Sequence, residues 1–383
     1  MLALVLVALL TLVALALDYV SLWGRLPLLD SDLWVFREGG RAFAQGGALY
    51  FVTVGNNDWL YPPFGAMVMV PLQWLPLDGL QTTWWILNIA LLASVASIAF
   101  RPLLQRLDGA PRRAAALVGI TVVSIALAPT ADALGLGQVG IVLMWLCLVD
   151  VVLLEGRRSQ GALVGVAAAI KLTPLVFIAY FLVVRRWRSA LVSAGVLAAC
   201  WAIAAAFRPD LWQQFVDERI ALRTTSMIQG FDRTDFNQSL RGLLDGLGSS
   251  TPITLLWVTL SATVLAIALF AARREHRQGQ LVAAAAIIGL AGVLVSPLSW
   301  HHHAVWVVPA LGALIGDGLQ RWRIYVAAAA ALLMVVPPRT GGLIDLPADR
   351  FVIAYLVLMT GLVVSAWRTA GVVAVQPEQS HAA

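Results

Sequence analysis

The chain has 383 residues, of which 60% are hydrophobic and only 12% charged, and its formal net charge is +5. A water-soluble protein of this length needs many more polar residues to cover its surface, so the composition excludes a soluble globular protein. The positive charge does not indicate nucleic-acid binding, because the arginines stand in short clusters between apolar runs, as in the cytoplasmic loops of membrane proteins.

The apolar runs predict about twelve transmembrane helices in one all-α domain that covers residues 1–383. The first run lacks the basic start and the cleavage pattern of a signal peptide, so we interpret it as a retained helix. Five arginine clusters placed in the cytoplasm set the orientation and leave both termini cytoplasmic. The expected spans are 2–18, 80–100, 114–129, 139–154, 161–171, 172–184, 189–207, 251–272, 281–298, 304–317, 324–336 and 351–367.

Two segments depart from simple spans. Residues 61–77 are rich in proline, and we expect them to dip into the membrane as part of a first outer loop, 18–78; a second large outer loop covers 208–250. The run 161–184 has arginines at both ends, so it must turn back within the membrane. Proline disfavours helix at the residue before it, so the sequence Lys171-Leu-Thr-Pro174 predicts this break.

Lys171 is the only lysine in the chain, and it would lie at the tip of this hairpin. A cation inside a membrane is costly and usually has an anionic partner, and a phosphate fits that need. The structural alternative is a snorkelling side chain at a helix end. Asp30 and Asp32 follow the first helix and precede Trp34 and Phe36, a setting that can hold a carboxylate in a partly dry site where it accepts a proton.

Three of the five histidines are consecutive, at 301–303. Neighbouring residues on a helix point about 100° apart, so these rings should diverge, which disfavours a metal site. We expect hydrogen bonds from His301, His302 and His303 to a phosphate or a sugar hydroxyl, and a flat apolar face for a sugar ring from Trp300 or Trp306. The amides of Gln138, Asn237 and Gln238 are candidate sugar ligands, with helix capping and loop structure as the alternative.

Together these segments resemble glycosyltransferase family 87 of the GT-C superfamily, the polyprenol-phosphate-mannose-dependent α-(1→2) mannosyltransferases of mycobacterial type. The resemblance rests, in chain order, on Asp32–Phe36, Leu49-Tyr50, Tyr61–Phe64, Gly137–Val139, Ala169–Pro174, Asn237–Leu240 and Ser296–His303. It implies a GT-C-like fold in the plasma membrane with an outer-face active site. It also implies a polyprenyl phosphomannose donor and a glycolipid or lipoglycan acceptor, such as a phosphatidylinositol mannoside.

The resemblance further implies an inverting transfer with Asp32, or Asp30 as the fallback, as general base. Lys171, His302, His303 and Arg41 would bind the donor phosphate, and Gln138, Asn237, Gln238, Trp300, His301 and Tyr61 would contact sugar or acceptor. We expect no cofactor and no obligatory metal; the alternative is a divalent ion held by Asp30, Asp32 and Asp132. An arabinosyl or glucosyl donor and a transporter are the competing functions, and acceptor identity and oligomeric state stay open.

Overall fold

The computed structural model describes residues 31–54, 57–217, 237–245, 247, 251–335 and 350–373. The first expected span, Asp30, both chain termini and the greater part of the second outer loop lie outside the described residues.

The first outer loop has regular structure of its own. Its elements are α2 (Asp32–Gln45), η2 (Leu49–Phe51), the two-residue antiparallel strands β1 (Thr53–Val54) and β2 (Asn57–Asp58), α3 (Pro63–Met69) and η3 (Val70–Trp74). α2 buries Leu33, Val35, Phe36 and Phe43 on one face, as an amphipathic helix does. It packs closely on the α3–η3 segment, because a Cβ at Gly40 would lie 2.5 Å from the carbonyl oxygen of Met69.

The remainder of the described chain is helical. The helices up to the second outer loop are α4 (Leu77–Ala99), α5 (Arg101–Leu104), α6 (Ala110–Ile125), α7 (Ala128–Gly135), α8 (Gly140–Val152), α9 (Ala162–Ile170), α10 (Leu175–Val183), α11 (Trp187–Phe207) and α12 (Asp210–Phe215). The later ones are α14 (Leu240–Asp245), α15 (Thr251–Arg277), α16 (Leu281–Val295), η6 (His301–His303), α17 (Val307–Ile315), α18 (Arg321–Val335) and α19 (Arg350–Val373). Each expected span from residue 80 onward overlaps one of these helices.

Four of the described helices are long and apolar enough to cross a membrane alone: α4 from Gly79, α11, α15, and α19 as far as Arg368. A fifth span results if α6 and α7, which meet at 79°, are one bent crossing. The chain is therefore a polytopic helical membrane protein. Helix length alone supports fewer crossings than the twelve expected, because helices such as α8 and α16 are shorter.

The predicted break in the run 161–184 is confirmed. α9 ends at Ile170, Lys171 has extended backbone angles (φ −145°, ψ 138°), and α10 begins directly after Pro174. The base of this hairpin is anchored by the buried Asp150, whose carboxylate accepts the backbone N–H of Gly161 at 2.6 Å and that of Val164 at 2.8 Å. These bonds satisfy free N–H groups at the start of α9 and so fix the position of the helix that ends at Lys171.

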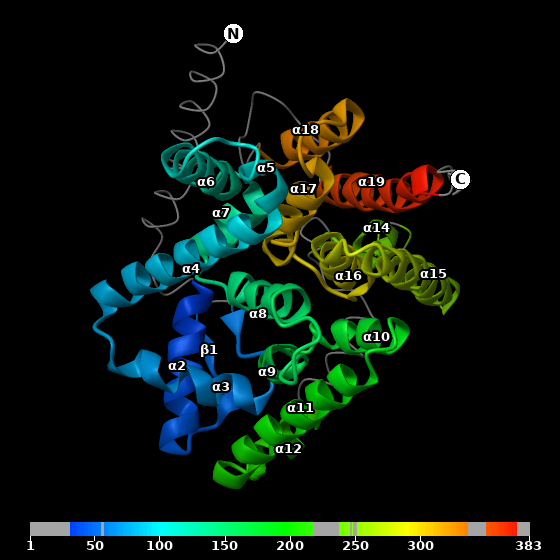
Figure 1. Cartoon of the computed structure of the whole chain (residues 1–383). Coiled ribbons are helices and arrows are strands. Elements are labelled where there is room, and N and C mark those ends of the chain that lie inside the picture. Colours follow the sequence, from blue (N-terminus) through cyan, green and yellow to red (C-terminus); the bar gives the residue numbers. More distant parts are fainter. Residues whose placement is uncertain are drawn as a thin grey trace, which may run out of the picture.

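Helix α16 lies at the centre of the C-terminal half, where it packs against α8, α15, α17 and α19 (Figure 1). Its small residues allow this close packing, and a Cβ at Gly289 would lie 2.0 Å from the Trp306 ring. The N-terminal elements α2 and α3 lie on the other side of the molecule, with α3 packed on α9 and α11 (Figure 1).

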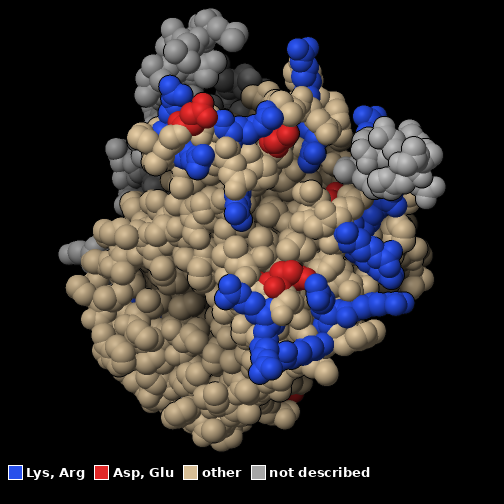
Figure 2. All heavy atoms as spheres, viewed as in Figure 1, with Lys and Arg blue, Asp and Glu red and all other residues tan. Residues whose placement is uncertain are grey.

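Basic side chains gather in groups on one face of the molecule, one of them over the region of α10 (Figure 2). Arg185 and Arg186 in the turn between α10 and α11 are exposed, as is Arg188 at the start of α11. Arg186 pairs with Glu155 from the loop after α8, which ties the two loops at the base of the hairpin together.

Candidate active site

Asp32 is the first residue of α2, and its carboxylate is half-buried. Gln138 donates a hydrogen bond from Nε2 to Asp32 Oδ2 at 2.6 Å. Desolvation by burial raises the pKa of Asp32 from 3.8 to about 6, against the opposing effects of the Gln138 hydrogen bond and the charge of Lys171. A carboxylate with this pKa is ionised at neutral pH and is basic enough to take a proton from a reacting group.

Gln138 reaches Asp32 because the loop after α7 runs against the start of α2. The backbone N–H of Leu33 donates to the carbonyl of Leu136 at 3.1 Å. Gly137 has a φ of 71°, and a Cβ there would lie 2.5 Å from the Leu33 Cβ, so glycine is required for this approach. The contact joins residues 106 positions apart in the sequence.

Tyr61 lies between the carboxylate and the lysine. Its hydroxyl is 3.5 Å from Gln138 Oε1, and its ring lies 5.1 Å from Lys171 Nζ, within cation–π range. The backbone carbonyl of Tyr61 accepts hydrogen bonds from Trp59 Nε1 at 2.8 Å and from the Tyr50 hydroxyl at 3.2 Å. Two buried aromatic residues thus hold Tyr61 in place.

Lys171 Nζ lies 3.2 Å from His303 Nε2. The other ring nitrogen of His303, Nδ1, accepts the backbone N–H of Trp300 at 3.3 Å. Burial and the charge of Lys171 hold the pKa of His303 well below its usual range, so the ring is neutral and carries one proton. In the tautomer in which Nδ1 accepts from Trp300, this proton is on Nε2. Two donors, Lys171 Nζ and His303 Nε2, therefore face the same space, and an anionic oxygen there would accept from both.

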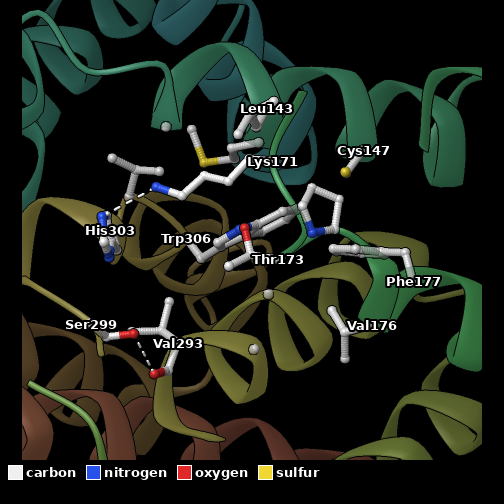
Figure 3. Close-up of a pocket in the computed structure, with 16 residues that line it drawn as sticks. Leu143, Cys147, Lys171, Thr173, Val176, Phe177, Val293, Ser299, His303 and Trp306 are labelled. Carbon is white, nitrogen blue, oxygen red and sulfur yellow. Dashed lines mark hydrogen bonds between the residues drawn. The ribbon is translucent and has the colours of Figure 1, made fainter. Parts of the chain in front are cut away.

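A pocket, partly open to the outside, begins at this pair of donors. Thr173 and Ser299 also line the pocket, and the Ser299 hydroxyl donates to the carbonyl of Val293 at 2.7 Å. Figure 3 shows Lys171 reaching to His303 at one end, while the other end is apolar. The apolar lining comes from α8, α10, α16 and the two residues before α17, and it includes Leu143, Cys147, Val176, Phe177 and Trp306.

The three consecutive histidines lie in different surroundings, although neighbouring rings touch, with 5.8 Å between the centres of His301 and His302 and 4.6 Å between those of His302 and His303. His301 Nε2 contacts the carboxylate of the fully buried Asp132, and its ring stacks on Phe351 with 5.7 Å between ring centres. His302 is buried, and neither of its ring nitrogens has a hydrogen-bond partner among the described residues. Within the described part of the chain, no three His, Cys, Asp or Glu side chains are arranged to hold a metal ion.

Asn237 and Gln238 support the backbone that leads to the histidines. Asn237 Nδ2 donates to the carbonyl of Pro297 at 3.0 Å, and its Oδ1 accepts the Ser299 N–H at 3.0 Å. The backbone N–H of Gln238 donates to the carbonyl of Ser299. The Trp300 ring lies parallel to the His303 ring, with 6.4 Å between their centres.

Arg41 is not brought to the cluster around Lys171. It is exposed on α2, where it contacts Gln45 at 3.4 Å and Glu38 at 3.8 Å. Arg208, which sequence reasoning missed, does support the site. Its guanidinium donates to the carbonyls of Ala42, Phe43 and Gly47, at 3.1, 3.3 and 2.9 Å, and so closes the C-terminal end of α2. No sequence pattern signals a contact across more than 160 residues.

Comparison with known proteins shows where this chain belongs. The model of glycosyltransferase family 87 matches residues 59–297, a range that contains Tyr61, Gln138 and Lys171 but neither Asp32 nor the three histidines. A protein of Mycobacterium tuberculosis (strain H37Rv) is 33% identical over 338 residues, which cover 83% of this chain and 77% of that protein. A protein of Mycolicibacterium smegmatis is 34% identical over 355 residues, which cover 83% and 78%.

Both relatives are named polyprenol-phosphate-mannose-dependent alpha-(1-2)-phosphatidylinositol mannoside mannosyltransferase. A second Mycolicibacterium smegmatis protein, 31% identical over 76% of this chain and 71% of its own length, is named for phosphatidylinositol pentamannoside. No solved structure matches the chain significantly.

Proposed function

Because the chain belongs to glycosyltransferase family 87, as its motifs had suggested, we propose that it is a membrane mannosyltransferase that uses a polyprenol-phosphate-mannose donor. The acceptor is a glycolipid of the phosphatidylinositol mannoside class, and the new linkage is α-(1→2). The chain crosses the plasma membrane about twelve times in a GT-C-like arrangement, with the arginine-rich face of Figure 2 in the cytoplasm and the active site on the outer side.

The observation that carries the proposal is one arrangement of three groups. Asp32 supplies a base, Lys171 and His303 supply two donors for a phosphate, and an apolar pocket begins beside them. A polyprenyl phosphate has the matching parts, a charged phosphate attached to a long apolar chain. One phosphate oxygen accepts from both Lys171 Nζ and His303 Nε2, and the first prenyl units lie along Phe177 and Trp306.

The transfer is a single displacement at the anomeric carbon. Asp32 takes the proton of an acceptor hydroxyl as that oxygen forms its bond to the anomeric carbon, and the bond from this carbon to the phosphate oxygen breaks. The electron pair of the broken bond stays on the polyprenyl phosphate, and Lys171 and His303 stabilise the charge that develops there. The attack comes from the face opposite the phosphate, so a β-linked donor yields an α product.

The described residues at the site can stabilise the negative charge of a monophosphate without a bound metal. The lysine provides one full positive charge, and the neutral histidine provides a hydrogen bond. Asp132, which a divalent ion site would require, contacts His301 instead. We therefore propose that the transfer needs no divalent ion.

A donor-exchange assay tests the proposed function. Membranes that contain the protein are given a mannolipid acceptor and, in parallel, polyprenyl phosphomannose, phosphoarabinose or phosphoglucose, with and without chelator. Transfer from the mannose donor alone, unaffected by chelator, supports the proposal. Transfer from the arabinose or glucose donor instead would show that the proposed donor sugar is wrong. Failure of all three donors would contradict the enzyme class.

A further inference from the structure

Gln138 was expected as a sugar ligand, but the structure places its amide on the carboxylate of Asp32. The amide is buried, with 3% of the residue exposed, and the Nε2–Oδ2 distance of 2.6 Å is short for a hydrogen bond from a neutral donor. The other end of the amide, Oε1, faces the Tyr61 hydroxyl at 3.5 Å. An amide held at both ends has a fixed orientation, because its nitrogen can only donate and its oxygen can only accept.

We propose that Gln138 is a positioning residue for the base: its amide keeps Asp32 ionised and aims the other oxygen, Oδ1, at the acceptor hydroxyl. The kinetic test of this inference rests on the proposed function, whereas the hydrogen bond between Gln138 and Asp32 is observed independently of it. A donor on Oδ2 stabilises the ionised carboxylate more than the protonated carboxyl, because a hydrogen bond to the charged form is stronger. It also leaves Oδ1 as the oxygen that accepts the proton.

Among the described groups near Asp32, Gln138 is the one that can stabilise the ionised carboxylate by a hydrogen bond. Lys171 is the charged group that interacts with the carboxylate, and Tyr61 is the neighbouring phenol. On α2 itself, Arg37 and Glu38 bind each other at 3.0 Å. Other titratable groups on the elements around α2 are Tyr50, whose hydroxyl bonds to the Tyr61 carbonyl, and Asp58 on β2. Burial raises the pKa of Asp32, and Gln138 is the neutral group whose hydrogen bond lowers it.

The test compares the pH dependence of kcat/KM for the wild type, Gln138→Leu and Gln138→Glu, with polyprenyl phosphomannose as donor. At low pH, kcat/KM falls as Asp32 is protonated, and this part of the profile is its acid limb. Loss of a hydrogen bond to a charged group moves a pKa by about one unit, so the acid limb of Gln138→Leu should move up by about one pH unit. At pH 6 its kcat/KM should be about five-fold lower than that of the wild type, and the deficit should shrink at pH 9. Gln138→Glu is isosteric and adds a like charge, so its limb should move further up.

The chain contains a matched control. Gln160 is also buried, with 2% exposure, and its Nε2 donates to Glu155 Oε2 at the same 2.6 Å, but at the base of the hairpin. Gln160→Leu removes an equivalent bond and should lower thermal stability while leaving the acid limb in place. A limb that does not move in either Gln138 variant, with KM raised equally at all pH values, would overturn the proposal and return Gln138 to the sugar-ligand role.

A second readout is independent of activity. Infrared difference spectra over a pH titration of purified protein report the protonated carboxyl band of Asp32, which is identified by its absence in Asp32→Asn. This band should appear at higher pH in Gln138→Leu than in the wild type. If the wild type transfers no mannose but the band moves, the proposed function fails and the pairing stands; if the band does not move, the pairing itself fails.

Discussion

Replacing Arg208 with alanine should loosen the C-terminal end of α2 and displace the carboxylate at its other end. Arg208 donates three hydrogen bonds to the carbonyls of Ala42, Phe43 and Gly47, at and just beyond the end of α2, and the Ala42 carbonyl also accepts the N–H groups of Gly46 and Gly47. The cation also interacts favourably with the negative end of the helix dipole. Hydrogen bonds from a charged group contribute about 1.5–3 kcal/mol each but are not additive, so we expect a loss of about 2–4 kcal/mol.

The effect on activity follows from the geometry of α2. The helix is 14 residues long, and Asp32 is at its first position, so a shift at the Arg208 end is transmitted to the base. Misplacement of a catalytic group by about 1 Å can cost about a hundred-fold in rate. Arg208→Ala should therefore lower kcat by at least about ten-fold and lower the midpoint of thermal unfolding in detergent.

Asp210→Ala is the matched control, because Asp210 binds the same guanidinium at 2.7 and 2.9 Å but does not touch α2's carbonyls. Its side chain is 48% exposed, and such surface ion pairs contribute at most about 1 kcal/mol. The reasoning is refuted if Arg208→Ala and Asp210→Ala have the same stability and the same kcat.

Three further outcomes are expected. Lys171→Ala should raise the donor KM by about ten- to a hundred-fold, through loss of a charge-assisted bond to phosphate, and an unchanged donor KM would contradict its role. Gly137→Ala should lower kcat and the thermal midpoint, because alanine is strained at a φ of 71° and its Cβ would lie 2.5 Å from Leu33; Gly119→Ala, inside α6 with open space around it, should lower neither. Wild-type kcat/KM should fall as pH decreases through about 6, since Asp32 must be ionised to act as base, and a flat profile down to pH 5 would speak against it.

The helical frame of the protein was readable from the sequence for definite reasons. Apolar runs between arginine clusters predicted the helices from residue 80 onward. The break at Lys171 was predictable because basic residues stand at both ends of a run too short for two crossings, and Pro174 lies at its centre. α2 was not foreseen as a helix, because its charged residues and its Gly39-Gly40 pair hide an amphipathic pattern from a search for apolar runs.

The partners within the site were not readable, because each pair is far apart in the chain. Sequence indicated that Asp32, Gln138, Lys171 and His303 are important, but not that the amide lies on the carboxylate or that the histidine lies on the lysine. Asn237 was expected as a sugar ligand, and the structure shows its side chain bound to the backbone at Pro297 and Ser299. Side chains with both donor and acceptor groups serve either use, so composition and spacing cannot separate them.

The most direct test of the central claim is mannosyl transfer by Asp32→Asn beside the wild type, with polyprenyl phosphomannose, a mannolipid acceptor and chelator in both reactions. Asparagine keeps the size of the side chain but cannot take the proton, and general-base catalysis contributes about 10²–10⁴-fold. We predict that the wild type transfers mannose in the presence of chelator and that Asp32→Asn loses at least about a hundred-fold in kcat, with equal amounts of folded protein. Transfer by Asp32→Asn at the wild-type rate would contradict the assignment of Asp32 as the base and would direct the search to Asp30.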